Sequence, residues 1–267
     1  MLAQYLTQPV HFKSGNIQTI KLDLLKPSFD ELIQFKPDVI IHAAAMASID
    51  TCELNQDRAW TVNFEASRKL IDITKRKQIR FIFISTDTVF DGKRGNYSEH
   101  DNPNPLNVYA QTKFESEQHV LENLDNAVIV RPALFYGISL NGSPSFTQIM
   151  LQKLKAGEQV KVFTDQYRTP LPVSRLAMGI WELVDLDFRG IIHLGGSERI
   201  SRSEMGEQLC QQFDLPLELL IRVTSQRAGQ IALRPLDCSL DISLGQDLLE
   251  TAFPNFTEGL RSAFLLD

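Results

Sequence analysis

The sequence predicts an α/β protein built on a doubly wound, mostly parallel sheet, followed by a smaller C-terminal lobe. Three observations support this fold class. Short apolar runs alternate with longer stretches of helical spacing, which is the pattern of parallel strands joined by crossover helices. The strands are near-continuous apolar runs, as expected where helices cover both faces of a sheet. After Gly137 the alternation loosens, and turn-forming residues become frequent at 139–145.

The first half of the chain supplies most of the main sheet. Its predicted strands are short apolar runs at 10–12, 17–22, 38–44, 80–85 and 127–131. Its predicted helices are the intervening segments at 28–35, 57–77 and 108–124. The helix at 57–77 has the clearest pattern, because its apolar residues recur at the spacing of one helix face: Ala59, Val62, Ala66, Leu70 and Ile73.

The second half adds a strand at 191–194 and another at 160–163. Its predicted helices lie at 146–156, 174–186, 202–213, 244–249 and 256–264. This order predicts two interleaved units, one formed by residues 1–137 with about 172–196 and the other by about 138–171 with 197–267. Ligands of doubly wound sheets bind beyond the carboxyl ends of the strands, so the residues that follow each strand are the candidates for a site.

Composition excludes several classes of protein. The 267 residues carry a net charge of −6, which argues against a nucleic-acid binder, because such domains gather positive charge on one face. No apolar run is long enough for a membrane span and the first residues lack a signal peptide, so we expect a cytoplasmic protein with no membrane partner. Cys52, Cys210 and Cys238 are too few and too scattered for a disulfide framework, and we expect no metal site.

A candidate acid–base site follows the strand at 80–85. Ser85 and Thr86 lie at its carboxyl end, and Tyr109 and Lys113 follow four residues apart, on one face of the next predicted helix. An ammonium close to a phenol favours the phenolate, and a phenol beside a hydroxyl could protonate a carbonyl oxygen. The alternative is a half-buried tyrosine and a solvated lysine on an amphipathic helix. The two strand-end hydroxyls and the Pro-Leu-Asn sequence at 105–107 favour the acid–base interpretation.

Several ordered motifs resemble the extended short-chain dehydrogenase/reductase superfamily. They are DVIIHAAA at 38–45 with Asp50 and Glu53 after it, STDTVFDG at 85–92, PLNVYAQTK at 105–113 and RPALFYG at 131–137. DQYRTP at 165–170 and RPLDCSLD at 234–241 resemble the dTDP-4-dehydrorhamnose reductase branch in particular. That branch also contains the regulatory β subunit of methionine adenosyltransferase. The similarity covers almost the whole chain and implies a Rossmann-like fold.

The resemblance implies roles for individual residues near the cofactor. Thr86, Tyr109 and Lys113 match the catalytic hydroxyl, acid and lysine of the superfamily, and the lysine also binds the nicotinamide ribose. Ala43, Ala44 and Ala45 match small residues that lie against the cofactor, with simple packing as the alternative. Asp23 matches an acidic residue near the adenine, with a turn residue as the alternative. Asn63 matches an asparagine that braces the active-site strands, with a solvent-facing amide as the alternative. Lys13 and Ser14 could pair with a 2′-phosphate, which favours NADP(H), with NAD(H) as the other candidate.

The resemblance also assigns residues to the substrate. Ser85, Thr88 and Leu134 fall at positions that line the sugar end of the pocket, and Arg168 and Arg234 fall in loops that meet a nucleotide diphosphate, where guanidinium groups suit phosphate oxygens. Each arginine has a surface position as its alternative. Thr88 and Leu134 stand where the rhamnose-type reductases carry a tyrosine and a tryptophan, so the sugar stays undetermined.

The motif that begins the superfamily is missing from this sequence. Its members start with an apolar strand that runs into a glycine-rich turn for the pyrophosphate, but no glycine precedes Gly15 here. Residues 2–6 are interpreted as the last turn of the helix that follows that glycine-rich turn. In the strand order 3-2-1-4-5-6 the first strand is central, so the strand at 38–44 should have an open edge. Either the start is assigned too far downstream or the chain is a remnant, and these 267 residues should bind a dinucleotide weakly or not at all.

The resemblance implies reduction of a keto group on a nucleotide-activated sugar, with the proton coming from Tyr109. Two alternatives remain open. One is a non-catalytic, reductase-fold binding subunit like the methionine adenosyltransferase regulator, and the other is a nucleotide-sugar epimerase or dehydratase that reuses the same tyrosine. A homodimer and a partner enzyme are both compatible with the resemblance.

Overall fold

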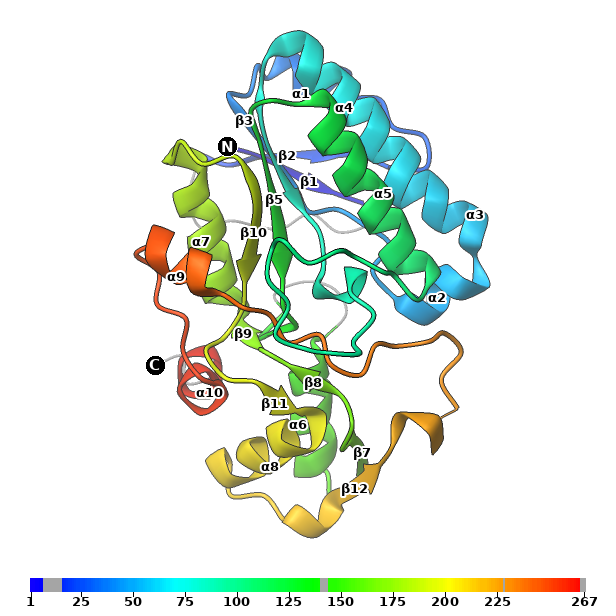
Figure 1. Cartoon of the computed structure of the whole chain (residues 1–267), viewed down its shortest axis with the longest axis vertical. Helices are drawn as coiled ribbons and strands as arrows, with labels where there is room; N and C mark the ends of the chain where they lie inside the picture. The colour runs from blue at the N-terminus through cyan, green and yellow to red at the C-terminus, as the bar shows by residue number, and fades with distance from the viewer. Residues whose placement is uncertain (7–15, 140–143, 228, 265–267) are drawn as a thin grey trace.

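The computed structural model describes residues 1–6, 16–139, 144–227 and 229–264 (Figure 1). Its main sheet contains β3 (Val39–His42), β4 (Arg80–Ile84), β5 (Ala127–Pro132) and β10 (Gly190–Leu194), in the order β10-β5-β4-β3. All three strand pairs are parallel. The predicted doubly wound, mostly parallel α/β fold is therefore confirmed.

Helices cover both faces of this sheet, which explains why its strands are apolar throughout. In Figure 1, α4 (Ala66–Lys77) and α5 (Val108–Asn123) lie on one side, while α7 (Val173–Asp185) and α9 (Ser243–Leu248) lie on the other. Alternate residues of β4 point to opposite faces. Phe81 and Phe83 pack with Leu70 in the first layer, whereas Ile82 packs with Leu183 in the second.

The predicted helix at 57–77 is helical along its length, but in three pieces. It is formed by α3 (Gln56–Ala59), a π-helical segment (Trp60–Glu65) and α4, and it is preceded by α2 (Ile49–Leu54). The helix α1 (Asp30–Gln34) lies within the predicted helix at 28–35. The π-helical segment is where Asn63 is placed.

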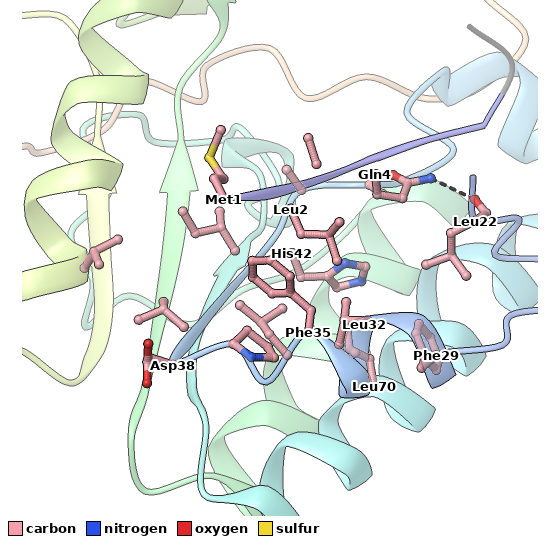
Figure 2. A pocket seen from close by; sticks show the side chains of 18 of the residues that line it. Met1, Leu2, Gln4, Leu22, Phe29, Leu32, Phe35, Asp38, His42 and Leu70 are labelled. Carbon is pink, nitrogen blue, oxygen red and sulfur yellow. Dashed lines mark hydrogen bonds between the residues drawn. The ribbon is translucent and has the colours of Figure 1, made fainter. Parts of the chain in front are cut away.

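The start of the chain differs from the sequence prediction. Residues 2–6 do not form a helical turn, because β1 (Leu2–Tyr5) is a strand paired in parallel with β2 (Gln18–Lys21). Pairing with β1 satisfies the main-chain groups on one edge of β2, and Gln4 Nε2 donates a hydrogen bond of 2.8 Å to the Leu22 carbonyl (Figure 2). β1 and β2 form a sheet of their own and leave β3 at the edge of the main sheet, as expected. The predicted strand at 10–12, together with Lys13 and Ser14, lies outside the described residues.

The second half of the chain builds a further core beside the main sheet. It contains α6 (Phe146–Lys155), α8 (Arg202–Gln212) and α10 (Phe256–Phe264), with β7 (Val160–Phe163) paired to β12 (Leu220–Val223). Short strand pairs join this region to the sheet: β6 (Phe135–Tyr136) with β9 (Leu171–Pro172), and β8 (Tyr167–Arg168) with β11 (Ile200–Ser201). The division of the chain into two interleaved units stays a prediction.

The segment 235–241 runs between the loop after β4 and strand β8. Asp237 N donates to the Gly92 carbonyl at 3.1 Å, and Cys238 N donates to the Tyr167 carbonyl at 3.2 Å. Gly92 has φ +72°, and a Cβ there would lie 2.5 Å from Leu236 N. Only glycine fits this crossing, because any side chain would collide with backbone.

Candidate active site

The carboxyl end of β4 presents a cluster of buried hydroxyl groups. Thr86 caps a single 3₁₀ turn (Asp87–Val89), with its Oγ1 accepting a hydrogen bond from Thr88 N at 3.2 Å and lying 2.9 Å from Thr88 Oγ1. Ser85 Oγ is buried and has no hydrogen-bond partner within the described part of the chain. The predicted hydroxyls at 85, 86 and 88 are therefore gathered at one strand end.

Tyr109 lies in the first turn of α5, whose N-cap is Asn107. The Asn107 side chain accepts a hydrogen bond from Ala110 N at 3.0 Å, which fixes the start of the helix. Tyr109 is half-buried, and burial raises the pKa of its phenol well above the ordinary value. The Thr86 hydroxyl opposes this shift, which places it next to the phenol. Tyr109 is therefore a protonated donor at neutral pH.

Lys113 lies one helical turn further along α5 and is 2% exposed. Its Nζ is 3.9 Å from the centroid of the Phe83 ring. Burial lowers the pKa of Lys113 to about 7, and the Glu117 charge only partly opposes this because Glu117 is paired with Arg131 at 2.7 Å. We expected Lys113 to lower the pKa of Tyr109, but in this structure burial dominates and the pKa of the tyrosine is raised.

Asn63 joins the loop after β3 to α5. Its Oδ1 accepts a hydrogen bond from Met46 N at 2.8 Å, and its Nδ2 donates to the Met46 carbonyl at 3.1 Å and to Thr112 Oγ1 at 3.0 Å. Asn63 is 1% exposed, so its amide does not face solvent. No sequence pattern singled out Thr112, which lies inside the YAQTK string and connects this brace to the helix that carries Tyr109.

Arg168 uses most of its donors on the protein itself. Its Nε lies 3.4 Å from Asp87 Oδ2, and its terminal nitrogens donate to the carbonyls of Tyr167, Pro235 and Leu236. Asp87 is buried, and burial raises the pKa of its carboxyl against the opposing charge of Arg168. Arg168 therefore ties the loop after β4 to the segment 235–241.

Arg202 is a second guanidinium close to this pair, and sequence patterns did not single it out. Its Cζ lies 3.8 Å from the centroid of the Phe146 ring, and its backbone N donates to the Gln166 carbonyl at 2.9 Å. Burial lowers the pKa of Arg202 to about 9, and the neighbouring charge of Arg168 adds to the shift. Phe146 and Arg202 are far apart in sequence, so only folding brings the guanidinium of Arg202 to this ring.

Arg234 holds a loop against the helices around the site. Its Nη1 donates to Asp50 Oδ1 at 2.8 Å and to the Ala232 carbonyl at 2.9 Å, and this hydrogen bond to Asp50 lowers the pKa of the carboxyl. The same loop accepts a hydrogen bond from Asn107 Nδ2 at the Leu233 carbonyl. The loop 231–234 is thereby fixed beside the start of α5 and close to Tyr109.

The residues predicted to contact a dinucleotide suit its nicotinamide end. Ala43, Ala44 and Ala45 follow β3 as a run of small side chains, and Lys113 Nζ has no hydrogen-bond partner among the described residues, so an amine is available to a ribose. Asp23 is a turn residue here, accepting a hydrogen bond from Leu25 N at 2.9 Å. In the described ranges no glycine precedes Gly92, so these residues include no glycine-rich turn for a pyrophosphate ahead of β4.

The described residues include neither a metal-ligand cluster nor a membrane-spanning helix. No group of three or more His, Cys, Asp or Glu side chains in these ranges is placed to hold a metal ion. None of the described helices combines the length and apolar character needed to cross a bilayer.

Comparison with known proteins extends over most of the chain. The sequence matches the RmlD substrate binding domain family over residues 6–265. Among curated relatives, methionine adenosyltransferase 2 subunit beta of Danio rerio is 32% identical over 83% of this chain and 71% of its own length. The probable low-salt glycan biosynthesis reductase Agl14 of Haloferax volcanii is 31% identical over 86% of this chain and 78% of its own length.

Solved structures resemble the fold closely. A hypothetical dTDP-4-dehydrorhamnose reductase from Sulfolobus tokodaii is 38% identical with a TM-score of 0.83, covering 94% of this chain and 89% of its own. A dTDP-4-dehydrorhamnose reductase from Bacillus anthracis in complex with NADP is 26% identical with a TM-score of 0.86, covering 94% and 90%. These neighbours support an oxidoreductase-like enzyme. The chain belongs to the RmlD substrate binding domain family, within the extended short-chain dehydrogenase/reductase superfamily.

Proposed function

We propose that this protein reduces a keto group on a nucleotide-activated sugar, with NADP(H) as cofactor. The observation that supports this most directly is the placement of Tyr109 beside Thr86, one helical turn from the buried Lys113. Relatives with reductase names and a neighbour solved with NADP support the same reaction class.

The residues divide the work of carbonyl reduction between them. Tyr109 holds its proton at neutral pH because burial raises its pKa, so it donates that proton to the carbonyl oxygen as the alcohol forms. Thr86 Oγ1 donates a hydrogen bond that orients the same oxygen. NADP(H), when bound, supplies the hydride. Lys113 binds the ribose, and its charged form stabilises the phenolate left on Tyr109.

The proposed contacts with the sugar follow strands β4 and β5. Ser85, Thr88 and Leu134 surround the sugar end of the substrate. Ser85 Oγ has no hydrogen-bond partner among the described residues, so its hydroxyl is available to the sugar. Arg234, with 18% of its side chain exposed, is the better of the two predicted phosphate contacts, because Arg168 is 7% exposed and already bound to Asp87. A nucleotide diphosphate would therefore meet Arg234 first.

A non-catalytic binding subunit is the second candidate function. The observation that favours it is the 32% identity to methionine adenosyltransferase 2 subunit beta of Danio rerio, over 83% of this chain. Such a protein would keep the substrate pocket while acting through a partner enzyme.

The test is NADPH oxidation by the purified chain with a 4-keto nucleotide sugar, at millimolar NADPH because weak cofactor binding is expected. Tyr109→Phe should abolish turnover and leave cofactor affinity unchanged, whereas Tyr5→Phe in β1 should leave both unchanged. Full activity in Tyr109→Phe would contradict the mechanism. A partner enzyme that co-purifies in the absence of any NADPH oxidation would favour the binding subunit.

A further inference from the structure

Arg202 is a charged side chain that the proposed mechanism does not use. It is the first residue of α8 and is half-buried. Arg168 and Arg234 each pair with a carboxylate, whereas no carboxylate among the described residues forms an ion pair with Arg202. Its Nη1 lies 3.8 Å from the sulfur of Met205, which is a weak acceptor. A cation that has lost part of its water without gaining an anion is a candidate for contact with a charged ligand.

Contacts with two neighbouring elements fix where this guanidinium lies. Its Cζ is 3.8 Å from the centroid of the Phe146 ring, and Phe146 is the first residue of α6. The backbone N of Arg202 donates to the Gln166 carbonyl at 2.9 Å, directly after the pairing of β11 with β8 (Figure 1). An aromatic ring against a planar guanidinium leaves the N–H groups at the guanidinium edge free to donate hydrogen bonds.

Positive charge exceeds negative charge around Arg202. The carboxylate of Asp87 lies 3.4 Å from Arg168 Nε, so it compensates that arginine first. Burial and the charge of Arg168 together lower the pKa of Arg202 to about 9, and the charge of Asp87 only partly opposes them. Arg202 is therefore still protonated at neutral pH. Two guanidinium groups share one carboxylate, which leaves a positive charge uncompensated among the described residues.

This charge lies on the side of the site that is proposed for the sugar. The backbone of Leu134 lowers the pKa of the Asp87 carboxyl, which places Leu134 beside that carboxyl. Leu134 and Phe146 also pack against the same apolar cluster. Arg234, the proposed phosphate contact, is instead paired with a carboxylate of α2. Arg202 and Arg234 therefore belong to different walls of the candidate site.

We propose that Arg202 binds an anionic group of the nucleotide-activated sugar through the N–H groups at its guanidinium edge, while the ring of Phe146 supports the guanidinium face. This role rests on the proposed function, because the ligand is the substrate of that reaction. Two parts of such a substrate share the required chemistry of paired, negatively charged oxygens: a carboxylate on the sugar, and the diphosphate. A guanidinium donates two parallel hydrogen bonds to either group. The bound anion compensates the half-buried charge of Arg202.

Equilibrium binding of nucleotides to the whole chain tests this role, by calorimetry in the absence of NADPH. The ligands are UDP-glucuronate, UDP-glucose and dTDP-glucose, with uridine and thymidine as ligands that carry no anion. Arg202→Met should weaken the binding of at least one nucleotide sugar by about tenfold, because a hydrogen-bonded charge pair is lost. The two nucleosides should show no difference between the variant and the wild-type chain.

The pattern of losses identifies the anion. Equal losses for UDP-glucuronate and UDP-glucose would assign Arg202 to the diphosphate. A loss confined to UDP-glucuronate would assign Arg202 to a carboxylate on the sugar, and the wild-type chain should then bind UDP-glucuronate more tightly than UDP-glucose. Arg202→Lys keeps the charge without the paired donors, so it should retain part of the affinity in either case.

Arg199 provides a matched control. Its Cζ also lies 3.8 Å from an aromatic centroid, that of Tyr167, but its guanidinium is paired with Asp237 at 2.6 Å. Arg199→Met should leave the affinity for nucleotide sugars unchanged. Thermal unfolding separates a ligand contact from a structural one. Arg202→Met should not lower the melting temperature of the free chain, but it should reduce the rise in melting temperature that a nucleotide sugar produces.

Three results would overturn this role. Equal affinity of the wild-type chain and Arg202→Met for all three nucleotide sugars would show that the guanidinium meets no substrate anion, and would leave the proposed reduction standing. An equal loss in Arg199→Met would show a general effect of surface charge. Absence of binding of all three sugars to the folded wild-type chain would contradict the proposed function as well. By contrast, no NADPH oxidation together with Arg202-dependent binding would contradict the reduction alone.

Discussion

Lys113 Nζ lies over the ring of Phe83 at 3.9 Å from its centroid, while the carboxylate four residues further along the same helix, that of Glu117, is held by Arg131. The lysine is thus buried without a carboxylate of its own. The same ammonium lowers the pKa of His42 in addition to the burial of that histidine. The interior around Lys113 and His42 therefore favours the neutral form of both side chains over the protonated form.

The first prediction concerns Lys113 and alkaline pH. Its pKa is lowered from 10.5 to about 7, so between these values the unfolded chain binds a proton that the native chain has lost. The free energy of unfolding should therefore rise with pH across that window, by about 5 kcal/mol at most, and should be independent of this group below pH 7. Urea unfolding from pH 6.5 to 10 checks this. Lys113→Met should remove the rise, whereas Lys75→Met, at an exposed lysine, should retain it.

The second prediction concerns the loss of stability at acidic pH. Burial lowers the pKa of both His42 and His193 to about 3, with positive neighbours adding to the shift. The unfolded chain then binds more protons than the native chain between pH 6.5 and 3, so stability should fall as the pH falls, by about 1.4 kcal/mol per pH unit for each histidine. His42→Gln should reduce this slope by one proton. His100→Gln is the control, because His100 is exposed; an equal effect there would contradict the assignment.

The third prediction concerns Asn63 as a positioning residue. Asn63→Ala removes its hydrogen bonds to Met46 and Thr112 and leaves buried backbone groups without partners, which should cost about 1–3 kcal/mol of stability. If the site works as proposed, kcat should fall while the pH dependence of kcat keeps its shape. Asn55→Ala at an exposed asparagine should change neither. A displaced pH profile in Asn63→Ala would show that the amide does more than position α5.

The fourth prediction concerns the Arg168–Asp87 pair. Arg168→Met should destabilise the chain by about 3–5 kcal/mol, because it leaves the buried Asp87 carboxyl without its cation. The double variant Arg168→Met with Asp87→Asn should recover part of that loss in chemical unfolding. The exposed pair Arg222–Glu207 is the comparison, with an expected coupling of about 1 kcal/mol or less. Additive effects at Arg168 and Asp87 would contradict the prediction, because they would show that the two side chains are not energetically coupled.

Much of the fold could be predicted because β4 and β5 are buried on both faces, and β3 keeps the same kind of apolar run at the edge of the sheet. The segments at 38–44, 80–85 and 127–131 are continuous apolar runs that β3, β4 and β5 occupy with small changes at their ends. The prediction for residues 2–6 is wrong, because five residues of mixed polarity are compatible with either a helical turn or a strand, and pairing with β2 decides between them. The π-helical turn at Asn63 leaves no mark on the apolar spacing.

Only those residues of the candidate site that lie within short local motifs could be predicted. Thr86, Tyr109 and Lys113 fall in two short strings, and the structure brings their elements together at the end of β4. Contacts between distant segments were not visible in the sequence: the bond from Arg168 to Asp87, the place of Arg202 against Phe146, and the direction of the pKa shift at Tyr109. These two contacts and this pKa shift depend on burial in the folded chain, which a sequence pattern does not reveal.

The path of residues 235–241 has a consequence for how such proteins diversify. Because this segment hydrogen-bonds to Gly92 on one side and to Tyr167 on the other, the C-terminal third of the chain cannot be exchanged as a cassette. A transplanted C-terminal region would have to bring a strand that fits over a left-handed glycine in the recipient. New substrate preferences in this fold should therefore arise by point changes at positions such as Thr88 and Leu134, and chimeras joined at Gly137 should misfold unless the loop at 91–97 travels with them.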